Sequence, residues 1–67
     1  MKRKWTNQAT CDANLEIRND ETSCGQLMYL LKKFPEVFAL RQAMIETFGY
    51  KSGVDYQQLA EIALEEA

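Results

Sequence analysis

The chain has 67 residues, of which 46% are hydrophobic and 27% are charged, with a formal net charge of -2 and no histidine. This composition is typical of one small globular domain over 1–67 and excludes disorder over the whole length. The size is near the lower limit for a core without a metal, a disulfide or a second subunit. No apolar stretch approaches the length of a secretory signal core or a membrane span, so we expect a cytoplasmic protein with Cys11 and Cys24 as free thiols.

Charge is distributed unevenly along the chain. Residues 1–18 carry four basic and two acidic side chains, residues 19–51 carry four of each, and residues 52–67 carry four acids alone. This asymmetry predicts either a positive head that folds across the last helix or head-to-tail attraction between copies. A nucleic-acid partner is not expected, because such binders need a basic face overall.

The first elements in chain order are an arm and a strand. We expect a flexible arm over 1–9. Residues 10–18 alternate between apolar side chains (Cys11, Ala13, Leu15 and Ile17) and polar ones, and this period of two predicts a half-buried strand. A lone strand needs a mate. The mate is either the arm, folded back as a hairpin, or the same strand of a second subunit.

Ser23 marks the start of the first predicted helix, over 23–33. Its hydroxyl can accept the backbone N–H of Gln26, whose side chain can reach back in a capping box. Lys32 and Lys33 lie in the last turn, where positive charge suits the helix dipole. Apolar residues from Cys24 to Phe34 share one face of this helix, which we assign to the core.

Pro35 predicts a sharp bend, because it disfavours helical backbone at the residue before it and suits the first position of a new helix. The second helix is therefore expected over 35–47, with Gly49 as the left-handed residue that ends it. The alternative is one kinked helix over 23–48. Asp55 then caps a third helix over 56–66 in an Asp-x-x-Gln box.

These elements predict an α+β fold that is mostly α, with a short N-terminal strand or hairpin packed on a three-helix unit. The apolar periodicity predicts the composition of its core. The expected core residues are Leu15, Ile17, Leu27, Leu30, Leu31, Phe34, Phe38, Met44, Ile45, Phe48, Leu59 and Ile62.

Two helices carry more apolar surface than one neighbour covers. In 35–47 Arg41 projects from an apolar arc that includes Leu40, so it either extends to water or to Glu16 or Glu66, or marks the edge of a partner-binding face. The third helix has an alanine-centred face flanked by Tyr56 and Leu64. Simple helix packing or a homodimer explains that face.

Two aromatic residues are further candidates for partner binding. Tyr29 lies beside the two lysines of the first helix, where it is either an ordinary surface aromatic or a contact hot spot. Trp5 follows three basic residues, so the arm resembles in composition a short anionic-surface contact, or Trp5 folds back onto the core.

No chemical site is predicted. Two cysteines without histidine cannot supply the usual four zinc ligands, and no cofactor motif or nucleophile–base pair is present, so no metal, no cofactor and no enzyme is expected. The favoured function is a non-enzymatic protein-interaction or regulatory module, a homodimer of the size common among phage or bacterial accessory proteins. The alternative is a dimeric ribbon-helix-helix-like DNA-binding regulator, whose strand here would present acidic Asp12 and Glu16 to the DNA.

Overall fold

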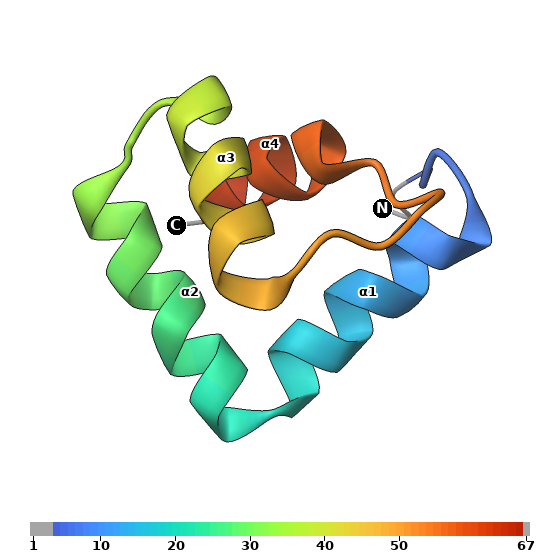
Figure 1. Cartoon of the computed structure of the whole chain (residues 1–67), viewed down its shortest axis with the longest axis horizontal. Coiled ribbons are helices and arrows are strands. Elements are labelled where there is room, and N and C mark those ends of the chain that lie inside the picture. Colours follow the sequence, from blue (N-terminus) through green and yellow to red (C-terminus); the bar gives the residue numbers. More distant parts are fainter. Residues whose placement is uncertain (1–3, 67) are drawn as a thin grey trace.

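Four helices follow one another in the computed structural model, which describes residues 4–66. They are α1 (Gln8–Asn19), α2 (Glu21–Lys33), α3 (Val37–Phe48) and α4 (Tyr56–Glu66). Residues 4–66 contain no strand, so the fold is all-α and the predicted α+β class is wrong. Figure 1 shows α1 and α2 as the two arms of a V, with α3 and α4 lying between them.

The segment predicted as a strand lies within α1. The Asn7 side-chain oxygen accepts hydrogen bonds from the backbone N–H of Thr10 (2.8 Å) and from its hydroxyl (2.7 Å), which caps the helix. At helical spacing Thr10, Ala13 and Ile17 are buried, whereas Leu15 is 49% exposed. The period-two pattern was misleading because a nine-residue stretch also fits the helical period, and its Asp, Asn and Ala residues disfavour strands.

α2 begins two residues earlier than predicted because Asp20, not Ser23, is its cap. The Asp20 carboxylate accepts the backbone N–H of Ser23 at 2.8 Å, and this bond lowers the pKa of Asp20. The predicted capping box that begins at Ser23 is therefore wrong. Because Asp20 alone separates α1 from α2, the chain turns sharply at the base of the V.

The predicted bend at Pro35 is confirmed. α2 ends at Lys33 and α3 begins at Val37, so a single kinked helix is excluded. α3 starts two residues later than predicted, with Glu36 as a cap that makes no side-chain hydrogen bond. Gly49 ends α3 with a φ of 87°, a backbone angle that residues with a side chain rarely adopt.

The start of α4 holds the segment before α1. Asp55 caps α4 as predicted, accepting the backbone N–H of Gln58 at 3.1 Å. The Gln58 side chain does not complete the expected box, because its oxygen accepts the Thr6 backbone N–H at 2.9 Å and its amide donates to the Lys4 carbonyl at 3.0 Å. The predicted flexible arm is therefore held against α4 from Lys4 onward.

The core lies where α3 and α4 pack together between the arms of the V. Among the predicted core residues Leu15 and Phe38 are exposed, by 49% and 59%. Those that are buried are Ile17, Leu27, Leu30, Met44, Leu59 and Ile62, and those partly buried are Leu31, Phe34, Ile45 and Phe48. Sequence reasoning missed the small and polar members, among them Thr10 and Ala60, both fully buried.

Candidate functional site: a groove between α2 and α4

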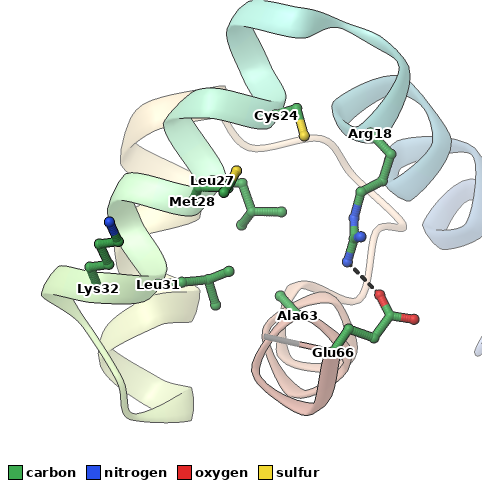
Figure 2. Close-up of a pocket in the computed structure, with 8 residues that line it drawn as sticks. All are labelled: Arg18, Cys24, Leu27, Met28, Leu31, Lys32, Ala63 and Glu66. Atoms are coloured by element: carbon green, nitrogen blue, oxygen red, sulfur yellow. Dashed lines mark hydrogen bonds and ion pairs between the residues drawn. The ribbon is translucent and has the colours of Figure 1, made fainter.

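An open groove of about 400 Å³ lies between α2 and the end of α4. Figure 2 shows its side chains, which come from one face of α2, from the last turn of α4 and from the end of α1. The lining residues are Arg18, Cys24, Leu27, Met28, Leu31, Lys32, Ala63 and Glu66. Five of the eight are apolar or sulfur-containing residues, so the surface is suited to an apolar ligand.

The groove lies between two helices that pack mainly on other elements. α2 packs on α1 and α3, and α4 packs on α3 and α1, so α2 and α4 do not pack closely along their length. Leu27 on the inner side of α2 is 4% exposed and belongs to the core, whereas Met28 on the groove side is 59% exposed. The helix therefore divides its apolar residues between the core and an open surface.

An ion pair closes one end of the groove. Arg18, in the last turn of α1, donates from a guanidinium nitrogen to the Glu66 carboxylate at 2.6 Å (Figure 2). Both side chains are more than a third exposed, so the pair adds little to stability. Lys32 is exposed at the other end of the groove. The apolar lining therefore has the Arg18–Glu66 ion pair at one end and a lysine at the other.

The six residues predicted to bind a partner are not brought together. Leu40 is fully buried and Tyr56 is 6% exposed, so neither presents surface to a partner in this structure. The Tyr56 hydroxyl instead donates to the Gly49 carbonyl at 2.9 Å. Leu64 is half-buried against the core, and Tyr29, 60% exposed, is not among the residues that line the groove.

Arg41 and Trp5 complete that set. Arg41 contacts neither Glu16 nor Glu66; its guanidinium lies 6.0 Å from the Phe38 ring centre, and its buried Nε has no hydrogen-bond partner among the described residues. Trp5 is half-buried against the core, as the folded-back alternative predicted. The basic residues before Lys4 lie outside the described residues, so the predicted anionic-surface contact of the arm stays a prediction.

Sequence reasoning assigned the whole apolar face of α2 to the core and so missed the groove. A signal was present, because Cys24, Met28 and Leu31 repeat at helical spacing on one edge of a face that also holds Leu27 and Leu30. A face this wide exceeds what one neighbouring helix covers. The same argument was applied to α4, where the alanine-centred face proves to be core: Ala60 and Ala63 are 0% and 2% exposed.

A polar cluster joins the start of α1 to the start of α4, and its role is structural. Thr10, fully buried, accepts the Asp55 backbone N–H through its hydroxyl at 2.9 Å. The Thr6 hydroxyl donates to the Asp55 carboxylate at 2.7 Å, and with the Gln58 backbone N–H this lowers the pKa of Asp55. Each polar group here is satisfied by another, which leaves none directed at a ligand.

Within residues 4–66 no group of three or more His, Cys, Asp or Glu side chains could hold a metal ion, and no helix there is long and apolar enough to cross a membrane. The fold and groove thus define a small helical protein with an open apolar groove between α2 and α4. In comparisons with known proteins no family model matches the chain, and neither curated proteins nor solved structures give a match.

Proposed function

We propose that this chain is a non-enzymatic protein-interaction module that binds an apolar segment of a protein partner in the groove between α2 and α4. The observation that carries the proposal is the groove itself, an open cavity of about 400 Å³ in which exposed Met28 and half-buried Leu31 lie beside the buried Leu27 and Ala63. Exposed apolar surface of this kind marks interaction sites in small proteins.

The arrangement of polar groups favours a protein segment over a small molecule. Small-molecule sites combine an enclosed apolar pocket with polar groups that converge on the ligand. Here Arg18 and Glu66 are directed at each other, and Lys32 stands at the rim. An open apolar strip along a helix is the surface on which an amphipathic segment places side chains at helical spacing.

The ribbon-helix-helix alternative is not retained. That architecture reads DNA with a strand paired across a dimer. Residues 10–18, which were to supply the strand, are part of α1, and the part of the chain that the structure describes contains no other strand.

Site-directed photocrosslinking in extract of the native cell tests the proposal. A photoreactive residue at Leu31, in the groove, should capture a discrete protein, whereas one at exposed Gln42 on α3 should not. A Leu31→Arg variant should lower recovery of that protein by affinity capture at least about tenfold, because a charge is placed on the apolar floor.

Two controls separate lost binding from lost folding. Circular dichroism melting should show that Leu31→Arg remains helical, and Gln42→Arg, which adds the same charge at an exposed position, should retain capture. The groove would be contradicted as the binding site if photoreactive residues at Leu31 and Gln42 captured the protein equally. Full recovery of that protein by a folded Leu31→Arg variant would contradict it as well.

A further inference from the structure

The outer face of α2, which shares Met28 and Lys32 with the groove, carries a second pattern that its own fold does not use. Glu21, Gly25, Met28 and Lys32 are all exposed and follow one another at intervals of four, three and four residues. On an ideal helix these positions fall within an arc of about 60°. The alternation of three and four is the spacing of the seam along which two helices pair.

This seam is complementary to itself when reversed. In an antiparallel pair related by a two-fold axis between positions 26 and 27, Glu21 of one copy faces Lys32 of the other, and Gly25 faces Met28. A two-fold interface uses the same patch on both subunits, so each of these contacts occurs twice. A parallel pair would instead place Glu21 against Glu21 and Lys32 against Lys32.

The residues beside the seam lie on its two flanks, Cys24 on one and Tyr29 on the other. Tyr29 is 60% exposed, and its hydroxyl accepts a hydrogen bond from the Lys33 ammonium at 3.4 Å. In the seam itself, the acid at the start of α2 and the lysine at its end therefore favour the antiparallel arrangement.

Gly25 supplies the shape complementarity. Glycine in the middle of a helix costs stability relative to alanine, so its position needs a reason. The fold provides none, because no heavy atom of a neighbouring described element lies within 4 Å of where its Cβ would be. An absent Cβ at the seam leaves room for the opposing Met28, a flexible side chain that is 59% exposed.

We propose that α2 pairs antiparallel with α2 of a second copy of this chain, with Met28 packed over Gly25 and Glu21 paired with Lys32 across the two-fold axis. One short helix from each copy forms the contact, so the dimer is weak and reversible. The inference goes beyond the groove partner, because it concerns a second copy of this chain and uses Glu21 and Gly25, which do not line the groove. Met28 and Lys32 belong to both surfaces, so the second copy and the groove partner would compete for them.

Sedimentation equilibrium at increasing protein concentration tests the pairing. The full chain should show a reversible monomer–dimer equilibrium that develops below roughly 1 mM, the weak end of protein association. Lys32→Glu and Glu21→Lys should each raise the dimer Kd about tenfold, because each places like charges together twice. The double variant E21K/K32E should recover the wild-type Kd within about threefold, because both attractive pairs return in reversed polarity.

A Gly25→Gln variant separates a broken interface from a broken fold. A glutamine side chain should raise the melting temperature through its better helix propensity, yet abolish the dimer by blocking Met28. Thr47→Lys, an exposed change outside α2, should leave the Kd unchanged. A monomer mass at all concentrations, or equal dimerisation by wild-type, Lys32→Glu and Gly25→Gln chains, would overturn the proposal while leaving the groove proposal intact.

Discussion

The contact between α3 and α4 and the outer face of α2 use similar residue types in opposite ways. At the α3–α4 contact, Leu40 and Ala60 are both fully buried, so a large and a small side chain are enclosed within the same core. On α2, Met28 and Gly25 are also a large and a small residue, but both are exposed. The difference shows that one region of this protein stabilises the monomer while the other is left available for contact.

Substitutions in the two regions differ in how much stability they cost. Close packing makes interior changes costly, because a cavity cannot fully collapse. Exposed positions tolerate change, usually within about 0.5 kcal/mol. Substitutions at the α3–α4 contact should therefore lower stability, whereas those on the outer face of α2 should change association.

Leu40→Ala should be the most destabilising of these substitutions. Leu40 is fully buried, so its truncation should lower the free energy of unfolding by about 2–5 kcal/mol, enough to unfold much of a chain this small. Met28→Ala, at a 59% exposed position, should change it by less than about 0.5 kcal/mol. Urea unfolding followed by circular dichroism measures both. Equal losses would show that the outer face of α2 contributes to the monomer core.

Thr10→Val should destabilise the junction between α1 and α4 by about 1–3 kcal/mol. The isosteric valine keeps the volume but leaves the Asp55 backbone N–H without its acceptor, and it also removes the hydroxyl donor to Asn7. Thr10→Ser, which keeps the hydroxyl, is the matched control. If valine proves as stable as serine in thermal melts, the buried hydroxyl is not needed to hold the two helix starts together.

Acid should loosen the start of α4 before it affects the core. Hydrogen bonds from Thr6 and from the Gln58 backbone lower the folded pKa of Asp55. Stability from such a group is present above its unfolded pKa of about 3.9 and is lost as pH falls through the lowered folded value. The Asp20 cap of α2, whose pKa is lowered by the Ser23 backbone N–H, acts in the same direction.

Asp55→Asn isolates this effect. Asparagine can still cap the helix but does not titrate, so the variant should show a weaker decline in melting temperature below about pH 4 than the wild-type chain. Asp55→Ala, which loses the cap, should cost about 1 kcal/mol near neutral pH. Identical acid profiles for the wild-type chain and Asp55→Asn would show that other carboxylates determine the acid response.

Gly25→Ala has the smallest expected effect on folding and the opposite sign. Alanine should stabilise α2 by up to about 1 kcal/mol, because no described neighbour obstructs a Cβ at this position. The same methyl group should weaken self-association. Melting temperature and dimer Kd should therefore both rise, and a rise in only the melting temperature would show that Gly25 has no role in the seam.

Local signals in the sequence correctly predicted boundaries of three of the four helices. Pro35 separates α2 from α3, Gly49 ends α3, and Asp55 caps α4, because each of these residues acts through its own backbone or through neighbours three or four positions away. The helical period between Cys24 and Phe34 likewise predicted α2, although the position of its cap was wrong.

Tertiary structure decided what local signals leave ambiguous. Residues 10–18 fit both a strand and a helix by pattern, and the helix prevails where Thr10 can be buried with its hydroxyl bonded to Asn7 and Asp55, which is 45 positions away. The division of α2 between core and groove also depends on how far α2 diverges from α4. An apolar residue has the same hydrophobicity on either side of a helix, so only the placement of neighbouring elements determines whether it forms core or open surface.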